Sequence, residues 1–251
     1  MRIAVAGATG RVGHHAVEVL EERGHDVVAI SRSRGVDVVA GDGLAGALSG
    51  VESIIDAATG QSPELGPATR FFTTAARNLQ EAGQQAGAER IVVVSIIGTD
   101  KFTGGYGAAK LAHEQAHAAG PVPAHILRAS QFHEFVAQLM DWGRQDDVVY
   151  VPRMRTQLVA ARTVAEVLAD LATAPEPGSA GTPVSEVAGP REENLVEMAR
   201  LLATRRGDPV RIEGVSDPSD ADHLNETGAL LPGPDAILAG PTFEEWLDAT
   251  S

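Results

Sequence analysis

The feature that most constrains this chain is a glycine-rich turn close to its beginning. The apolar run Ile3-Ala4-Val5-Ala6 leads into glycines at positions 7, 10 and 13, and a helix-forming segment follows. Gly7 permits a tight turn, Gly10 lets the backbone approach a bound group, and Gly13 lets the helix pack close to the strand. Free N–H groups at a helix start attract anions, so the turn predicts binding of a dinucleotide pyrophosphate; a purely structural turn is the alternative.

The pattern after this turn predicts a whole sheet. Short β-branched runs alternate with amphipathic stretches as far as Arg128. Such alternation is typical of a parallel sheet covered by helices on both faces. We predict a Rossmann-type doubly wound α/β fold, with strands at 2–6, 26–30, 36–40, 53–57, 91–95 and 125–128 and helices at 12–23, 71–87 and 106–119.

The pattern loosens after residue 128. We predict helices at 131–142, 163–174 and 194–204, strands at 148–151, 184–188 and 210–215, and a surface loop at 175–183, which is rich in proline and glycine. The expected organisation is an NAD(P)-binding core at residues 1–130. A small C-terminal substrate-binding cap at residues 131–251 would be partly interleaved with this core as one structural unit.

The composition excludes several classes of function. The chain has 251 residues and no cysteine, which excludes thiolate nucleophiles and cysteine-ligated metal sites. A formal net charge of −14 argues against nucleic acid or anionic membranes as partners. No apolar run reaches the roughly 20 residues of a membrane span, and the N-terminus does not resemble a signal peptide. We expect a cytoplasmic protein that acts on a small molecule, and the sequence sets no oligomeric state.

The residues after the second predicted strand bear on the choice of cofactor. They read Ile30-Ser31-Arg32-Ser33-Arg34. An NAD site usually has an acidic residue here, which accepts a hydrogen bond from the ribose 2′-hydroxyl. Two guanidinium groups and two hydroxyls suit a 2′-phosphate better. We therefore predict that Ser31, Arg32 and Arg34 bind NADP, with NAD less favoured; arginines on a solvated loop are the alternative.

Tyrosine and lysine are scarce, with two of each in the chain, and one of each lies in Tyr106-Gly107-Ala108-Ala109-Lys110. Residues four apart share a helix face, where an ammonium can lie beside a phenol and lower its pKa. Such a phenol can give a proton to a carbonyl oxygen as hydride reaches the carbon. We predict Tyr106, Lys110 and the preceding Ser95 as catalytic residues; an ordinary exposed helix face is the alternative.

A competing motif lies on the same predicted helix. His113-Glu114-Gln115-Ala116-His117 fits the H-E-x-x-H pattern of zinc sites. Zinc would need a third ligand, for which His133 or Glu134 is a candidate, but the strand predicted before them fits the doubly wound fold instead. Glu114 also follows Lys110 by four residues, the spacing of a helical ion pair. We predict no metal and two surface imidazoles.

These motifs together resemble the atypical short-chain dehydrogenase/reductases of the NmrA-like, NAD(P)-binding family. The resemblance covers almost the whole chain. The matching residues are Gly7 through Gly13, Gly41-Asp42, Val94-Ser95, Tyr106 through Lys110 with Glu114, Ile126-Leu127-Arg128, Arg162 through Val167, Glu186 through Pro190, and Thr242 through Leu247.

The resemblance implies roles for individual residues. The pyrophosphate would be held by Gly7, Thr9, Gly10, Arg11 and Val12, with Gly13 completing the turn; Asp42 with Gly41 would border the adenine, and Ala57, Ala58 and Thr59 would line the adjoining ribose. Ser95 would approach the nicotinamide, Lys110 would hydrogen-bond its ribose, and Tyr106 would donate the proton. Two positions depart from the pattern: relatives often have a second serine where this chain has Ile96, and proline where it has Ala129.

The substrate is expected at the carboxyl ends of the strands, where doubly wound sheets bind ligands. Gln131, Phe132 and His133 directly follow a predicted strand, so we predict that they bind substrate; a helix-surface position is the alternative for His133. The predicted function is NADPH-dependent reduction of a small apolar carbonyl or quinone. Two alternatives are an NADP(H)-binding redox sensor without turnover and an enzyme of natural-product metabolism with a structural cofactor.

Overall fold

The computed structural model describes residues 1–175, 181–217 and 223–250. The chain divides into two compact units, Met1–Arg128 with Val164–Ser185, and Ala129–Thr163 with Glu186–Ser251. Residues 164–175 and 181–185 belong to the first unit, whereas the predicted boundary at residue 130 places them in the C-terminal part. The division into a core and a cap stays a prediction. The predicted loop at 175–183 lies outside the described residues between 176 and 180.

A seven-stranded sheet has the order β12-β9-β5-β4-β3-β1-β2. Its strands are β1 (Arg2–Ala6), β2 (Asp26–Ile30), β3 (Ser53–Asp56), β4 (Arg90–Ile96), β5 (Ala124–Ala129), β9 (Val184–Ala188) and β12 (Ile237–Leu238). β1 pairs in parallel with β2 on one side and with β3 on the other. β2 and β3, which follow β1 along the chain, therefore lie on opposite sides of it. Doubly wound folds bind their ligands in the crevice at such a reversal of strand order.

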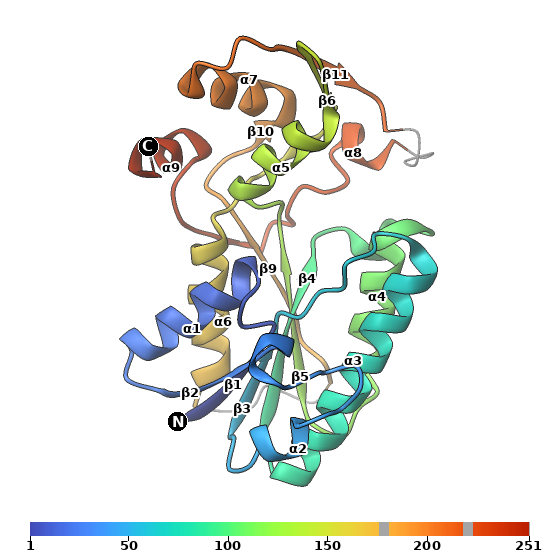
Figure 1. Cartoon of the computed structure of the whole chain (residues 1–251), viewed down its shortest axis with the longest axis vertical. Coiled ribbons are helices and arrows are strands. Elements are labelled where there is room, and N and C mark those ends of the chain that lie inside the picture. The colour runs from blue at the N-terminus through green and yellow to red at the C-terminus, as the bar shows by residue number, and fades with distance from the viewer. Residues whose placement is uncertain (176–180, 218–222, 251) are drawn as a thin grey trace. The chain divides into compact units, whose positions relative to one another are not determined.

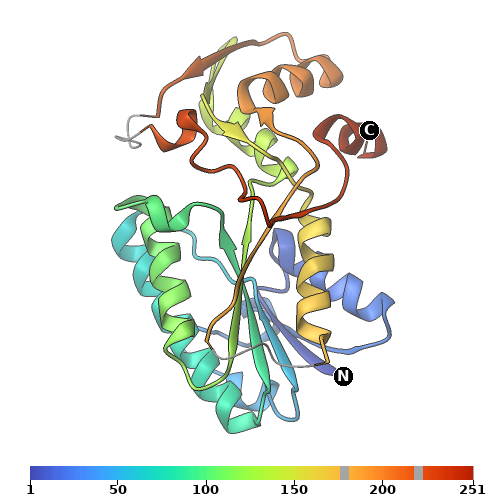
Figure 2. The same cartoon turned by 180° about the vertical axis from the view of Figure 1, so that it is seen from behind.

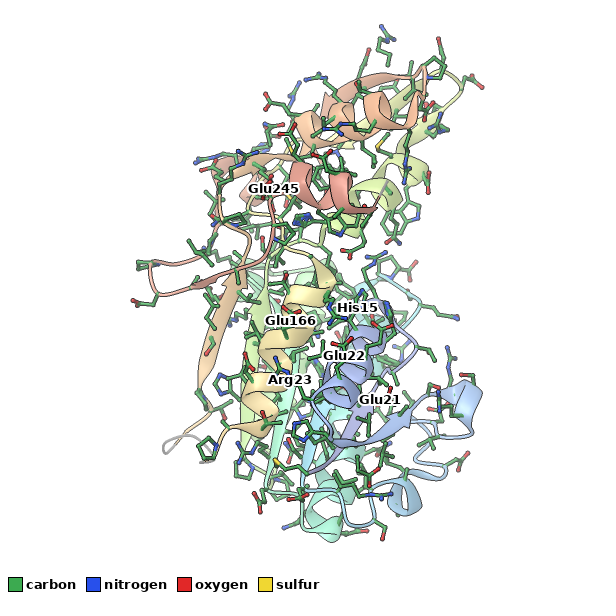
Figure 3. The ribbon with its side chains drawn as sticks, turned by 90° about the vertical axis from the view of Figure 1, so that its left-hand side faces the viewer. His15, Glu21, Glu22, Arg23, Glu166 and Glu245 are labelled. Carbon is green, nitrogen blue, oxygen red and sulfur yellow. The ribbon has the colours of Figure 1, made fainter. Side chains whose placement is uncertain are left out.

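Helices cover both faces of the sheet in the first unit (Figures 1 and 2). α3 (Leu65–Ala86) and α4 (Gly105–Ala118) lie against one face, and α1 (Arg11–Glu22) and α6 (Ala161–Thr173) lie against the other. Figure 3 shows α1 and α6 side by side, where Arg23 Nη1 meets Asp170 Oδ1 at 2.8 Å. The predicted Rossmann-type fold is confirmed.

The packing explains why these segments become helices. In α3, the buried residues Phe72, Ala75, Ala76 and Leu79 recur at the spacing of one helix face. α3 and α4 approach through small residues, because Ala68 of α3 and Ala109 of α4 pack around Phe72 with Tyr106 at the edge. This packing fixes the position of Tyr106 at the contact between α3 and α4.

The strand predicted at 36–40 is wrong. The chain after β2 forms a short 3₁₀ helix, η1 (Arg32–Arg34), and then turns rather than adding a strand. Asp37 Oδ1 accepts hydrogen bonds from the backbone N–H groups of Val39 and Ala40, which replaces ladder partners with a local turn. Asn78 of α3 donates to the carbonyls of Val38 and Val39, so the apolar side chains pack without a strand. The sheet therefore follows the 2-1-3-4-5 order.

The second unit contains two small sheets, one of three strands and one of two. β7 (Val148–Pro152) pairs with β11 (Arg211–Val215) in parallel and with β6 (Arg144–Gln145) in antiparallel, and β8 (Arg155–Thr156) pairs with β10 (Glu193–Asn194). Its helices are α5 (His133–Gly143), α7 (Leu195–Arg206), α8 (Leu224–Thr227) and α9 (Phe243–Thr250). Glu245, labelled on α9 in Figure 3, accepts hydrogen bonds from Thr242 and so fixes the start of that helix.

Two short elements remain in the first unit, α2 (Leu44–Ala47) and η2 (Thr99–Lys101). Among the described residues, none of the helices combines the length and the apolar character that crossing a bilayer demands.

The turn between β1 and α1 yields a prediction for stability. A Cβ on Gly13 would lie 2.1 Å from the carbonyl oxygen of Gly7, so G13A should lower the free energy of unfolding by about 2–4 kcal/mol. G46A is the matched control, because a Cβ on Gly46 in α2 meets nothing within 4 Å and replaces a flexible helical residue. Urea unfolding of both variants measures the difference, and equal stability of G13A and wild type would contradict the close packing.

Candidate active site

The glycine turn brings the ends of β1 and β3 together. Gly7 has φ +77°, a backbone conformation that favours glycine, and a Cβ there would lie 2.6 Å from the carbonyl oxygen of Ala57. The chain after β3 runs through Ala57 and Ala58, which lie against the turn, to the exposed Thr59. That these three residues line the cofactor ribose stays a prediction.

The start of α1 fits an anion. Its N-cap residue is Gly10, which has no side chain to cap the helix, so no side chain accepts from the N–H groups of Val12 and Gly13. Thr9 and Arg11 are exposed beside them. A cradle built from glycine backbone at an uncapped helix start matches the needs of a pyrophosphate.

The residues predicted to select the cofactor lie at the end of β2. Arg32 and Arg34 are exposed in η1, and neither meets a carboxylate within ion-pair distance in the described ranges. The Ser31 and Ser33 hydroxyls lie 3.0 Å apart. Asp42 is exposed in a turn, where its carbonyl accepts from Asp37 N.

The phenol of Tyr106 has a different partner from the expected one. Its hydroxyl lies 2.9 Å from the Thr59 hydroxyl, which joins α4 to the chain after β3. The ring packs edge-on against Phe72. Burial raises the pKa of Tyr106, although the hydrogen bond with Thr59 opposes this shift. The expectation that Lys110 lowers the phenol's pKa is therefore not met.

Lys110 is buried, with 5% of its surface exposed. Its Nζ donates to the Val94 carbonyl at 2.6 Å and to His113 Nδ1 at 2.9 Å, and it lies 4.5 Å from the centroid of the Phe72 ring. Burial lowers the pKa of Lys110 to about 8, against the opposing pull of Asp56 and Glu114. The predicted ion pair with Glu114 does not form, because Glu114 is held elsewhere.

Two imidazoles predicted to lie on the surface are buried, which corrects that prediction. His113 and His117 both approach the fully buried Asp56 Oδ2, with Nε2 distances of 2.9 and 3.0 Å. Burial alone would raise the pKa of Asp56, but the hydrogen bonds from both histidines outweigh it and hold that pKa well below its usual range. Burial and then the charge of Lys110 lower the pKa of His113 to about 3.

These three side chains are of types that bind metals, and their ligand atoms lie close together. Their surroundings favour a hydrogen-bonded network instead. A histidine that binds a metal through Nε2 carries its proton on Nδ1, but Nδ1 of His113 faces the ammonium of Lys110, which can only donate. Glu114 of the H-E-x-x-H motif belongs to another set of contacts, with Ser95 and Arg128, so it does not face the two histidines as a general base.

Ser95 and Glu114 form the second buried set. Ser95 is buried, with 1% of its surface exposed. Its hydroxyl donates to Glu114 Oε1 at 2.5 Å. Arg128 holds the same carboxylate through two nitrogens at 3.0 and 2.8 Å and reaches Asp100 at 2.7 Å. The hydroxyl of the serine that was predicted to face the nicotinamide thus donates its hydrogen bond to a buried carboxylate.

The predicted substrate residues belong to the second unit. Gln131 Oε1 accepts from the Thr156 hydroxyl, and Phe132 forms a bridge with Val159. His133 is fully buried rather than on a helix surface; its Nε2 lies 3.2 Å from the Leu158 carbonyl, and its ring packs against Phe243 and Trp246. Burial lowers its pKa to about 4. Substrate contact by Gln131, Phe132 and His133 stays a prediction.

Comparison with protein-family models shows which family the chain belongs to. The model described as NAD(P)H-binding matches residues 7–175, which span the glycine turn, Asp56, Tyr106 and Lys110. The chain belongs to the NAD(P)H-binding family. This match confirms the predicted cofactor class and the resemblance to an NAD(P)-binding family. No curated protein is significantly similar to the chain in sequence.

Several solved structures share the fold over the whole chain. One is the NADPH-dependent quinone oxidoreductase QOR2 from Escherichia coli in complex with NADPH, at 19% identity over 99% of both chains with a TM-score of 0.75. Another is MoeE5 in complex with UDP-glucuronic acid and NAD, at 18% identity over 100% of both chains with a TM-score of 0.72. A UDP-N-acetylglucosamine 4-epimerase from Bacillus cereus matches at 18% identity over 99% of this chain and 94% of its own, with a TM-score of 0.71.

Five residues of these buried networks were not predicted as site residues from the sequence: Asp56, His113, His117, Gln80 and Arg128. Asp56 is the last residue of β3 and follows the apolar Ile54 and Ile55, and His113 and His117 lie one helical turn apart. A buried strand end facing a helix with two histidines was the available signal. Gln80 was less visible, because only the packing of α3 shows that it donates to the His117 carbonyl and lies 3.4 Å from His117 Nδ1.

The low pKa of His113 predicts acid sensitivity. The unfolded chain takes up a proton on this imidazole near pH 6.5, whereas the folded chain does so near pH 3. The free energy of unfolding should therefore fall as the pH drops from 6.5 towards 3, with this histidine contributing about 1.4 kcal/mol per pH unit.

H113Q removes this titration and keeps an amide that can donate to Asp56. Urea unfolding at pH 6.5, 5.5 and 4.5 should give a smaller loss for H113Q than for wild type. Parallel losses in the two proteins would show that His113 does not carry the linkage.

Proposed function

We propose that this protein is an NADPH-dependent oxidoreductase that reduces a small apolar carbonyl or quinone, with Tyr106 as proton donor. The observation that carries the proposal is the 2.9 Å contact between Tyr106 and Thr59. Thr59 follows Ala57, whose backbone lies against Gly7 in the glycine turn. The phenol is thus linked to the turn that receives the cofactor. The fold match to a quinone oxidoreductase that binds NADPH agrees with this assignment.

Bound NADPH would supply a hydride to the carbonyl group of the substrate. Tyr106 would then give its hydroxyl proton to the oxygen that gains negative charge. A raised pKa keeps the phenol protonated at neutral pH, which suits a proton donor. Lys110 uses two N–H groups within the described part of the chain, on Val94 and His113, and its third would hydrogen-bond a ribose hydroxyl.

The assignment of NADP rather than NAD is supported by the end of β2. Arg32 and Arg34 are exposed and have no carboxylate partner in the described ranges, so both guanidiniums can turn to a 2′-phosphate. Family membership and the fold matches support NAD(P)H as a class, since similar structures hold NADPH in one case and NAD in another.

A redox sensor without turnover is the second candidate, and the position of Ser95 favours it. The Ser95 hydroxyl, which was expected to approach the nicotinamide, donates to Glu114 instead, and Ile96 follows it where relatives often carry a second serine. A sensor would bind NADPH and oxidise none of it with any carbonyl or quinone offered. A partner captured with NADPH and released with NADP⁺ would support this reading.

Replacement of Tyr106 by phenylalanine tests the proton donor. Y106F should lower the rate of substrate-dependent NADPH oxidation by about 10²–10⁴-fold, because the substrate oxygen loses its acid, and should leave the NADPH Kd nearly unchanged. Y150F is the control, since Tyr150 of β7 is the only other tyrosine in the chain. The rate is measured at 340 nm over a panel of quinones and aldehydes, and equal turnover of Y106F and wild type would remove Tyr106 from this role.

Charge reversal at the end of β2 tests the choice of cofactor. The R32E/R34E variant should bind NADPH at least about tenfold more weakly and bind NADH with little change, because only NADPH has a 2′-phosphate for the two arginines to contact. R206E, a charge reversal in the exposed last turn of α7 in the second unit, is the control and should leave both affinities unchanged. Calorimetric titration gives the four Kd values, and tighter NADH than NADPH binding in wild type would reject the assignment.

A further inference from the structure

The ammonium of Lys110 is buried with no carboxylate in ion-pair distance within the described part of the chain. Its hydrogen-bond acceptors are a backbone carbonyl and the imidazole of His113. Burying a charge costs several kcal/mol unless partners stabilise it. The nearest compensation lies beyond His113, at the carboxylate of Asp56, which is itself fully buried.

The hydrogen bonds fix which nitrogen of His113 carries its proton. An ammonium donates and never accepts, so His113 Nδ1, 2.9 Å from Lys110 Nζ, is the acceptor. The ring proton is then on Nε2, which donates to Asp56 Oδ2. Asp56 thus selects the tautomer that presents a bare nitrogen to Lys110.

His117 contacts the same carboxylate without contacting Lys110. Its Nε2 lies 3.0 Å from Asp56 Oδ2, and its Nδ1 lies 3.4 Å from Gln80 Nε2. Asp56 Oδ1 accepts from Ala58 N, which satisfies the other oxygen. His113 and His117 therefore provide a matched pair, equal in their bond to Asp56 and different in their bond to Lys110.

We propose that His113 and Asp56 are positioning residues for Lys110: His113 holds the ammonium through its bare Nδ1, and Asp56 fixes that tautomer and supplies the compensating charge. The proposal rests on the proposed function, in which Lys110 binds the cofactor ribose. Asp56 and His113 touch neither substrate nor cofactor in it; they act through Lys110.

The other groups around Lys110 do not take this role. Glu114, on the same helix, is occupied by Ser95 and by Arg128 of β5. Tyr106, one turn earlier, pairs with Thr59. β4 provides the Val94 carbonyl, and α3 provides the uncharged ring of Phe72. Asp56 is the remaining charged group, and it reaches Lys110 through His113.

The chain's two lysines allow a direct test. Protein grown with lysine labelled at Cε gives two NMR signals, and K101R assigns them because Lys101 lies in η2. In cofactor-free wild type, the Lys110 signal should titrate near pH 8. In H113L, which removes the acceptor, its pKa should fall by at least about one unit, a tenfold loss in proton affinity.

H117L is the matched control. It removes one donor from Asp56 and leaves the acceptor of Lys110 in place, so the Lys110 pKa should stay within about 0.3 units of wild type. H113Q should restore most of the wild-type value, because a glutamine amide can accept from Lys110 and donate to Asp56. D56N, nearly identical in shape, should lower the Lys110 pKa through loss of charge, and it provides the test if H113L does not fold.

These outcomes separate the positioning role from a structural one. Equal shifts in H113L and H117L, or an unchanged Lys110 pKa in H113L and D56N, would overturn the proposal whatever the cofactor does. NADPH titration by calorimetry then adds the functional arm: H113L should bind NADPH more weakly at pH 7.5, and H117L should not. Failure of wild type to bind NADPH, with the pKa shifts intact, would overturn the proposed function alone.

Discussion

The architecture of the site depends on how closely the backbone of Gly7 approaches its neighbours. A Cβ on Gly13 would meet the Gly7 carbonyl, and a Cβ on Gly7 would meet the Ala57 carbonyl. No side chain separates β1, the start of α1 and the chain after β3, so their relative positions are fixed by backbone contact. Thr59 extends from this contact and reaches Tyr106. The glycine turn and the phenol of Tyr106 are therefore parts of one packed unit.

The sheet order explains how α4 divides its buried charges. Lys110, His113, Glu114 and His117 recur at the spacing of one helix face. That face covers three neighbouring strands in the order β5, β4 and β3. On the β3 side, Asp56 receives both histidines; on the β5 side, Arg128 receives Glu114; between them, Val94 and Ser95 of β4 accept from Lys110 and donate to Glu114. The buried polar side chains of this helix face thus find their hydrogen-bond partners on three neighbouring strands.

The parts of this arrangement that depend on local pattern could be predicted from the sequence. The glycine spacing, the apolar strands and the Tyr106–Lys110 interval are readable along the chain, and the structure has a strand, a turn and helices at these positions. What failed depends on contacts between distant residues. Val36, Val38 and Val39 have the composition of a strand, but Asp37 and Asn78 satisfy the backbone there as a turn.

The two histidines of α4 show the same limit. A histidine next to polar residues on a helix is predicted to be exposed, because the carboxylate that hydrogen-bonds to it when it is buried lies far away in the sequence. Asp56 is 57 and 61 residues away from His113 and His117. Likewise, a lysine four residues from a glutamate has the spacing of an ion pair, yet Glu114 is taken by Arg128, which lies on another strand.

The separation of Tyr106 from Lys110 has a chemical consequence. A phenol next to an ammonium would lose its proton more easily and could act as a base. Here the phenol is partly buried beside a hydroxyl and a ring, and its pKa is raised, so at neutral pH it holds a proton to give. Lys110, with a pKa near 8, is the group whose charge changes close to neutrality. In the proposed function, this arrangement would suit reduction, because Tyr106 would be protonated when the substrate oxygen gains negative charge, and Asp56 would act on the charge of Lys110 through His113.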